Sequence, residues 1–263
     1  MKSISVKSFI VCVSLIVVGL VLINVSDAKI DPDTLIGLWL FDEGKGDIAK
    51  DSSKNGRDGT LIKGPKWVDG KFGKALEFGG PLGQHVLTKN VPIPATGWSI
   101  SSWISRDTNA DYAIWINHNN VRKDGATLHL MFLPGTNTPR MCYHGDGDGF
   151  PLLSEVGKNV WTHIVFVIDP SGNRKVYLNG ELDNSDKNTV GYNGGDVPLL
   201  IGMFLDCCQF VGLVDDVGVF DVALTQDDVV NIMNNGLGKA IGLLPVSSEG
   251  QLTTVWGEIK TSR

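Results

Sequence analysis

Short segments in which apolar and polar residues alternate, or in which apolar residues dominate, run along most of the chain between turn-forming residues. In Trp98-Ser99-Ile100-Ser101-Ser102-Trp103-Ile104 the alternation predicts a β-strand with one buried face. The apolar segment 161–168 predicts a second strong strand, and 169–173 is its turn. Asn179-Gly180 is a tight-turn dipeptide, because both residues tolerate a positive φ. The pattern therefore predicts a protein made of sheets.

Nine further strands and one helix complete the expected elements. The strands are expected at 35–41, 75–78, 113–117, 127–132, 140–143, 175–178, 199–203, 210–213 and 214–220. The helix is expected at 225–235, where Thr225 caps the first turn and Gly236 ends the last. Strands at such regular spacing are typical of a sandwich, so we predict an all-β fold with one short C-terminal helix.

Composition agrees with a turn-rich sheet protein and narrows the class of partner. The 263 residues include 32 Gly and 11 Pro, and the length suits one large β domain. The formal net charge is −6, and Lys and Arg are scattered along the chain. Nucleic acid is therefore not expected as a partner, because binding to phosphates needs a clustered positive face. An acidic surface does suit cation binding.

The first 28 residues are predicted to be a signal peptide. Lys2 and Lys7 precede an apolar stretch at 9–23, and Ser26-Asp27-Ala28 supplies the small residues of a cleavage site. We therefore expect a secreted or cell-surface protein with no stable membrane insertion after cleavage. The alternative is an uncleaved N-terminal membrane anchor, although the apolar stretch is shorter than the ~20 residues of a spanning helix. The chain is therefore expected to consist of a signal peptide (1–28), one folded domain (29–238) and a C-terminal tail (239–263).

Three cysteines remain after cleavage, namely Cys142, Cys207 and Cys208. An exported chain meets an oxidising compartment, so a disulfide bond is expected. If the adjacent pair lies on a strand, only one of its members faces Cys142. The alternative is that all three are small buried thiols.

Six motifs in this order resemble the laminin-G-like, concanavalin-A-like lectin/glucanase family of jelly-roll domains. They are Gly37-Leu38-Trp39-Leu40-Phe41-Asp42-Glu43-Gly44 with 51–61, Gly73-Lys74-Ala75-Leu76-Glu77-Phe78, 98–103, Trp161-Thr162-His163-Ile164 with 176–180, Gly212-Leu213-Val214-Asp215-Asp216-Val217-Gly218-Val219-Phe220, and Ala223-Leu224-Thr225. Together they cover about residues 35–237. The resemblance implies a two-sheet antiparallel jelly-roll sandwich that binds glycans or proteins. It also implies a calcium ion where the first and last core strands meet.

By analogy with that family, the expected calcium ligands are Asp42, Asp51 and Asp215, with Asp216 as an alternative. Calcium takes several hard oxygen ligands from carboxylates and carbonyls on loops, and these residues end, follow or begin strands. The competing interpretation is that Asp51 and the nearby Asn55 only shape turns through hydrogen bonds to the backbone.

The expected burial of Asp215 supports the calcium hypothesis. Strict strand geometry puts Asp215 on the same face as Val217 and Val219, which predicts a carboxylate pointing inward at the rim of the sheet. A buried carboxylate without a partner is costly, and a cation would neutralise it.

Sugar binding needs an aromatic platform and polar groups for the hydroxyls, and several such residues lie on the middle segments. The expected ligand-binding residues are Tyr112, Trp115, His118, Asn119, His129, Tyr143 and His144. Trp115 has a competing assignment to the core. The remaining tryptophans of the family motifs are assigned to the core: Trp39, Trp98, Trp103 and Trp161.

Catalysis is not expected. Glycosidases of this architecture need two carboxylates across the scissile bond, and none of the six Glu residues pairs with another acid at strand spacing. Asp146 and Asp148 have that spacing but flank glycines in a predicted turn. The sequence favours a carbohydrate-binding module. A protein-binding or adhesive module is the alternative, and a polysaccharide hydrolase is the third and least favoured hypothesis.

Overall fold

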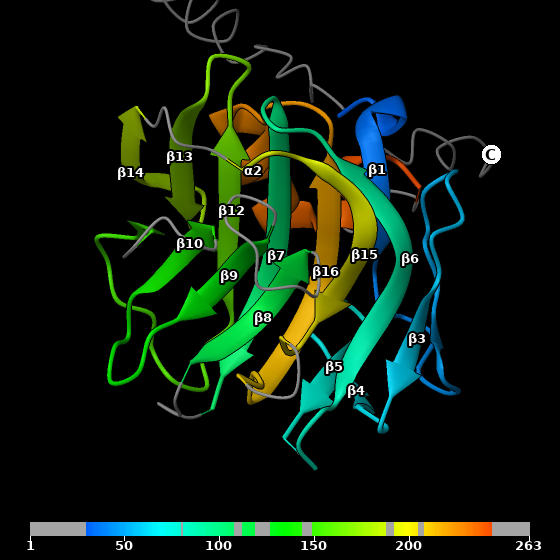
Figure 1. The fold of residues 1–263 in the computed structure, drawn as a ribbon. Helices are drawn as coiled ribbons and strands as arrows, with labels where there is room; N and C mark the ends of the chain where they lie inside the picture. The colour runs from blue at the N-terminus through cyan, green and yellow to red at the C-terminus, as the bar shows by residue number, and fades with distance from the viewer. Residues whose placement is uncertain are drawn as a thin grey trace, which may run out of the picture.

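The computed structural model describes residues 30–79, 81–107, 112–118, 127–143, 149–187, 192–204 and 208–243. Within these residues two antiparallel sheets pack face to face (Figure 1). The predicted all-β, two-sheet sandwich is thus confirmed. The predicted signal peptide, Asn119, His144, Cys207 and the chain after Leu243 lie outside the described residues.

The first sheet brings the beginning and the end of the domain together. Its strands, in spatial order, are β14 (Glu181–Lys187), β13 (Asn173–Leu178), β12 (Thr162–Ile168), β7 (Trp98–Arg106), β16 (Gly212–Phe220), β5 (Lys74–Phe78) and β4 (Lys66–Asp69). β1 (Leu35–Trp39) pairs with the second half of β16, and β5 pairs with the first half. The first and last strands of the sandwich therefore lie side by side.

The second sheet forms the front layer of Figure 1. Its strands, in spatial order, are β11 (Phe150–Pro151), β10 (Pro139–Tyr143), β9 (Leu128–Phe132), β8 (Ala113–His118), β15 (Gly195–Ile201), β6 (His85–Ile93), β3 (Gly59–Ile62) and β2 (Ile48–Ala49). Neighbouring strands of this sheet are antiparallel.

The core lies between the two sheets and is rich in aromatic residues. Trp39, Trp98 and Trp115 are fully buried there. The single indole donor of Trp115 is satisfied, because Nε1 donates to Ser102 Oγ at 3.1 Å. Burial of side chains of this size supplies much of the hydrophobic stabilisation of a sandwich.

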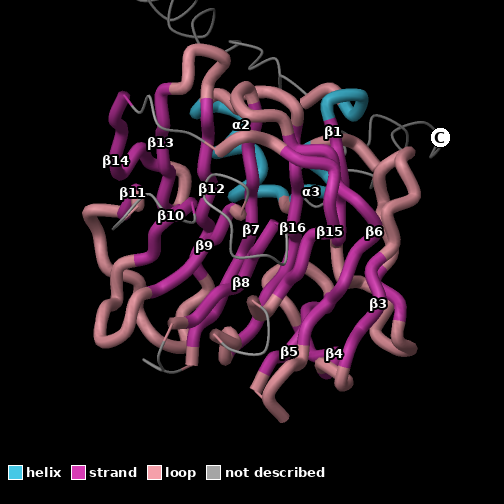
Figure 2. Tube along the Cα trace, viewed as in Figure 1, coloured by secondary structure: helices cyan, strands magenta, loops and turns pink. Residues whose placement is uncertain are grey.

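Two helices cover part of the outer face of the first sheet (Figure 2). They are α2 (Gln226–Asn235) and the short α3 (Leu237–Ala240), and a 3₁₀ turn, η1 (Pro32–Thr34), precedes β1. Thr225 and Asp228 form a capping box at the start of α2, which confirms the predicted start of this helix. Ala240 and Ile241, assigned to the tail from the sequence, are buried in the apolar cluster beneath these helices.

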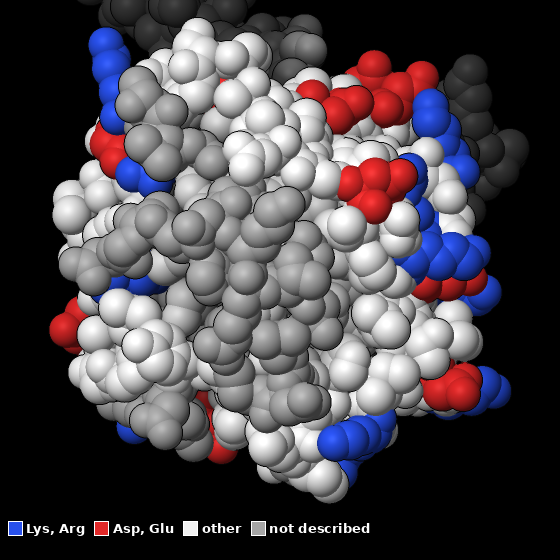
Figure 3. All heavy atoms as spheres, viewed as in Figure 1, with Lys and Arg blue, Asp and Glu red and all other residues white. Residues whose placement is uncertain are grey.

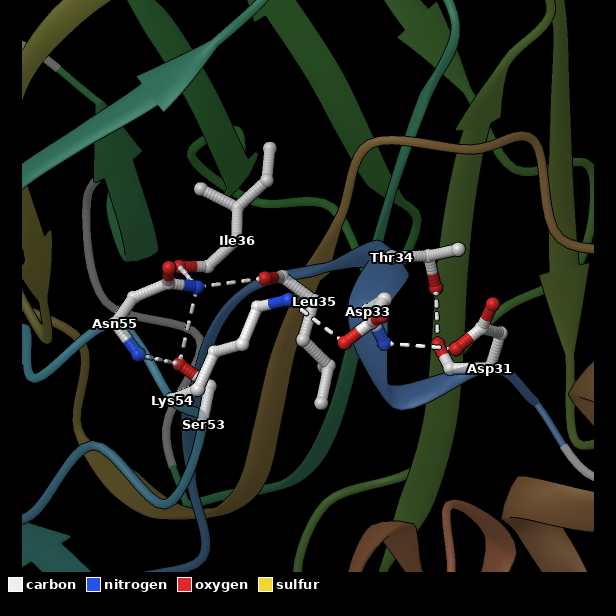
Figure 4. A network of polar contacts seen from close by, with 8 residues as sticks. All are labelled: Asp31, Asp33, Thr34, Leu35, Ile36, Ser53, Lys54 and Asn55. Atoms are coloured by element: carbon white, nitrogen blue, oxygen red, sulfur yellow. Dashed lines mark hydrogen bonds and ion pairs between the residues drawn. The ribbon is translucent and has the colours of Figure 1, made fainter.

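Side chains from the loop after β2 hold the N-terminal strand (Figure 4). Asn55 Nδ2 donates to the carbonyl oxygens of Leu35 at 2.7 Å and Ile36 at 3.1 Å. Lys54 Nζ contacts Asp33 Oδ1 at 2.7 Å. Asn55 thus satisfies backbone carbonyls at the start of β1.

Cys142 and Cys208 both belong to a small apolar cluster with Ile114, Met131 and Phe204. Because Cys207 lies outside the described residues, a disulfide bond stays a prediction. No helix among the described residues is both long enough and apolar enough to cross a bilayer.

Candidate functional site

The buried carboxylate of Asp215 anchors the turn between β4 and β5. Asp215 Oδ2 accepts hydrogen bonds from the backbone N–H groups of Lys71 at 2.9 Å and Phe72 at 3.0 Å. Its Oδ1 accepts from the N–H of Asp216 at 2.8 Å. The side chain is completely buried, so three backbone donors depend on one carboxyl group.

Asp215 does not share a face with Val217 and Val219, so this detail of the sequence interpretation is wrong. The register of β16 against β7 shifts between Asp215 and Gly218, and Asp216 adopts a φ of 44°. This β-bulge turns Val217 and Val219 into the core while Asp215 lies on the outer face beside Trp103. Strict alternation across 215–219 fails because the bulge adds a residue.

Two glycines of the turn at 69–74 allow the carboxylates to approach its backbone. A Cβ atom on Gly70 would lie 2.6 Å from Asp215 Oδ2. A Cβ atom on Gly73 would lie 2.0 Å from Asp42 Oδ1, and Gly73 also has a φ of 63°. Asp42 Oδ1 accepts from the N–H of Lys74 at 2.8 Å. Glycine is therefore required at both positions.

Asp216 completes a group of three carboxylates around this turn. Its Oδ2 accepts from the N–H of Leu237 at 2.7 Å, at the start of α3. Burial, and then the neighbouring Asp216, raise the pKa of Asp215 to about 8. Burial raises the pKa of Asp216 to about 7, and Asp42 adds to this increase. The three carboxylates therefore interact electrostatically.

Asp51, the fourth expected calcium ligand, has a different role. Its Oδ1 accepts from the N–H groups of Leu38 at 3.0 Å and Ser53 at 2.9 Å, and its Oδ2 accepts from the N–H of Arg57 at 2.7 Å. The turn-forming interpretation of Asp51 thus describes its contacts. In the described parts of the chain, no three Asp, Glu, His or Cys side chains are placed to hold one metal ion. As arranged, the four carboxylates fit hydrogen bonding to the backbone better than a shared calcium ion.

Next to this turn, a cavity of about 490 Å³ opens on the outer face of the first sheet. It is lined by Lys71, Phe72, Trp103, Trp161, Asn179, Met233 and Asn234. These residues come from the turn at 69–74, from β7, from the segment before β12, from the turn after β13 and from α2. We call it the aromatic pocket. Three aromatic rings with two amides and one amine form a mixed lining that suits a ligand with apolar faces and hydroxyl groups.

Trp103 lines the aromatic pocket and contacts the side chains of His163, Phe72 and Lys71. Its ring stacks on His163 with centroids 5.1 Å apart and meets the edge of Phe72 at 5.9 Å. Lys71 Nζ lies 4.6 Å from the centre of the ring, in a cation–π contact. Among the described residues, Trp103 Nε1 has no hydrogen-bond partner.

His163 is buried beneath Trp103. Its Nε2 lies 2.9 Å from Ser101 Oγ, and Nδ1 has no partner within the described part of the chain. Burial lowers the pKa of His163 to about 3, so the ring is neutral at pH 7. The neutral imidazole supports the Trp103 ring by stacking.

Most of the expected ligand-binding residues on the second sheet are buried. Trp115 is in the core, and His118 is fully buried with its Nε2 2.7 Å from the carbonyl oxygen of Val91 and its Nδ1 against Tyr192 Oη. Tyr143 packs in the core cluster, and His129 contacts the ring of Phe204. Tyr112 is the most exposed of the set, at 48%. These side chains therefore do not converge into one open platform.

Trp103 and Trp161 were assigned to the core from the sequence. Trp103 is buried, as expected, but it lies outside the core between the sheets, which the spacing of the tryptophans on β7 could have shown. Trp98 and Trp103 are an odd number of positions apart, so they lie on opposite faces of a regular strand. Trp98 is in the core, which places Trp103 on the outer face. Trp161 is half-buried and lies just before β12.

The chain belongs to the concanavalin A-like lectin/glucanases superfamily. The family model of the laminin-G type with this description matches residues 78–230, which is more than half of the chain. Among curated proteins, human adhesion G-protein coupled receptor D1 is 33% identical over 84 residues. That match covers 30% of this chain and 10% of the receptor, so the chain spans a small part of its relative.

Solved structures share the fold at low sequence identity. Domain 4 of AbnA, an extracellular arabinanase of Geobacillus stearothermophilus solved with arabinotriose, has a TM-score of 0.65 and 21% identity. The similarity covers 76% of this chain and 98% of that domain. The ligand-binding domain of botulinum neurotoxin serotype D, solved with N-acetylneuraminic acid, has a TM-score of 0.60 and 16% identity over 78% of this chain and 51% of that one. At these identities the likeness establishes the fold alone.

Proposed function

We propose that this protein is an exported, non-catalytic carbohydrate-binding module, and that the aromatic pocket is its binding site. The observation that carries the proposal is the grouping of Phe72, Trp103 and Trp161 with the amides of Asn179 and Asn234. Aromatic rings bind the C–H faces of a sugar, and amides bind its hydroxyl groups. The arabinotriose complex of the AbnA domain supports the choice of a glycan as ligand, because that domain has the same fold over nearly its full length.

The lining of the aromatic pocket supports a neutral ligand. Figure 3 shows the opposite face, that of the second sheet, where acidic and basic side chains lie mixed around the periphery and the described residues form no broad basic area. In the aromatic pocket the only charged residue among its described lining is Lys71. Its ammonium group already contacts the Trp103 ring.

Replacement of Trp161 tests the proposed site. We expect Trp161→Ala to weaken glycan binding by about 10- to 100-fold, since loss of an aromatic stacking partner costs roughly 1–3 kcal/mol. Isothermal titration calorimetry against glycans selected on an array measures the effect. Tyr112→Ala is the matched control, because it removes an exposed aromatic ring from the second sheet. Loss of binding with Tyr112→Ala but not with Trp161→Ala would move the site to that sheet and refute the assignment.

A protein-binding or adhesive module is the second candidate. The match to an adhesion receptor favours it, as does the similarity to the binding domain of botulinum neurotoxin DC, solved in complex with rat synaptotagmin II. A blank glycan array together with persistent binding to an extracellular protein would support this candidate over carbohydrate binding.

Calcium binding at Asp42, Asp215 and Asp216 stays a separate proposal. It requires these carboxylates to give up backbone hydrogen bonds and to move closer together than they lie in this structure. The raised pKa values of Asp215 and Asp216 support it, because a nearby cation would offset the cost of burying these carboxylates in charged form. We expect calcium to raise the melting temperature at pH 7.5 relative to EDTA, by differential scanning fluorimetry, and Asp216→Asn to reduce this difference. Melting curves that coincide in calcium and in EDTA would exclude the site.

A further inference from the structure

A second cavity lies on the same outer face of the first sheet. Its volume is about 340 Å³, and its lining includes Lys66, Glu77, Ser105, Asp107 and Asn159. We call it the polar pocket, because charged and amide side chains make up most of its functional groups. The proposed function makes no use of it.

The polar pocket and the aromatic pocket meet along β7. Ser105 lines the first and Trp103 lines the second, and both are on the outer face of this strand. Because the rise is about 3.3 Å per residue, the two positions are about 7 Å apart along the strand. The pockets are therefore immediate neighbours on one face.

The segment before β12 also contributes residues to both pockets. Thr162 pairs with Ile104, so the same antiparallel register places Trp161 beside Ser105. Asn159 continues the ladder, because its N–H donates to the carbonyl oxygen of Arg106 at 2.7 Å. Trp161 of the aromatic pocket thus lies between Trp103 and the polar pocket.

The functional groups change from the aromatic pocket to the polar pocket in a way that fits one extended ligand. Stacking rings lie at the aromatic end, and hydroxyl, amide and carboxylate groups of Ser105, Asn159 and Asp107 lie at the other. The charges of the polar pocket are of both signs, since Lys66 contacts Glu77 at 3.8 Å. Mixed charge of this kind provides hydrogen bonds to hydroxyl groups without favouring an anionic chain.

We infer that the two pockets form one groove for a linear, neutral polysaccharide, with consecutive sugar units running along β7 from the aromatic pocket past Trp161 into the polar pocket. The inference rests on the proposed carbohydrate-binding function and specifies its ligand class. The alternative is a site for a single terminal sugar, for which the aromatic pocket alone would be sufficient.

Binding of linear arabino- and cello-oligosaccharides of two to six units to the full chain tests the inference. For the series that binds, we expect affinity to increase at least about tenfold from the disaccharide to the longer members, because added units gain contacts in the polar pocket. The double variant Glu77→Ala/Asp107→Ala should lower affinity for the hexasaccharide by about tenfold and leave disaccharide binding within about twofold. Glu181→Ala, an exposed acid on β14 of the same sheet, is the control.

Each outcome of this experiment has a distinct meaning. Equal affinity for every chain length, or a double variant that binds the hexasaccharide as well as the wild type, overturns the groove and leaves the aromatic pocket as the glycan site. Absence of binding to every oligosaccharide, together with a blank glycan array, overturns the proposed function and the groove together. Absence of binding to these oligosaccharides beside array hits on other glycans overturns the groove alone. Unchanged melting temperatures of the variants show that any loss of binding is local.

Discussion

Asp215→Ala is expected to lower the free energy of unfolding by about 2–4 kcal/mol. The substitution removes a fully buried carboxyl group that accepts from three backbone N–H groups, the buried one of Asp216 and the partly buried ones of Lys71 and Phe72. Each buried donor left without a partner costs about 1–3 kcal/mol, and relaxation of the turn recovers part of this cost. Urea denaturation followed by tryptophan fluorescence measures the loss.

Asp69→Ala is the matched control for this substitution. Asp69 lies on the same turn, but its side chain is 93% exposed and its ion pair with Lys74 is at the surface. Surface pairs contribute about 0–1 kcal/mol, so the control should change stability little. A loss of stability as small as that of the control would show that the turn at 69–74 does not depend on the Asp215 carboxyl group.

The stability of the protein is expected to depend on pH through His163. Burial lowers the pKa of His163 to about 3 in the folded chain, below the ordinary value of 6.5, so the unfolded chain binds the proton more readily. The contribution of His163 is therefore fully present above pH 6.5 and is lost as the pH falls toward 3. Between pH 6.5 and 5 the loss amounts to about 2 kcal/mol, at about 1.4 kcal/mol per pH unit.

Comparison with His163→Phe isolates this contribution, since phenylalanine keeps an aromatic ring against Trp103. Both proteins retain Asp215 and Asp216, whose raised pKa values act in the opposite direction, and His118, whose pKa burial lowers to about 4. Urea denaturation from pH 7.5 to 5 should show the variant losing about 2 kcal/mol less than the wild type. Parallel stability curves would contradict the buried, neutral state of His163.

Most strands with strong apolar patterns could be predicted from the sequence, and the missed strands have physical reasons. β7, β9 and β12 were expected close to their actual bounds, because they contribute many side chains to the core. The separate strands expected at 210–213 and 214–220 are wrong, since Gly212–Phe220 form the single strand β16. β14 (Glu181–Lys187) was missed, since it is an edge strand with polar residues and no buried side chain. β6 (His85–Ile93) was missed because Lys89 and Asn90 interrupt its alternation and both are exposed.

The site was harder to predict than the fold because it depends on irregular backbone and on long-range contacts. Asp42, Asp215 and Asp216 lie around one turn, whereas Asp51, which the resemblance grouped with Asp42 and Asp215, binds the backbone of its own loop and of β1. The bulge at Asp216, however, reverses the face of Asp215. No local pattern predicts that Gly70 and Gly73 receive carboxylates from residues far away in the sequence. The aromatic pocket likewise combines five separate segments of the chain.

The pairing of β1 with β16 has a consequence for how the chain is made. Leu35 pairs with Phe220, so the first strand of the sandwich has no strand partner until nearly the whole domain has been synthesised. Contacts of such long sequence separation slow folding, because the loop between them must close first. Premature release of a shortened chain would leave an unpaired, apolar strand open to aggregation.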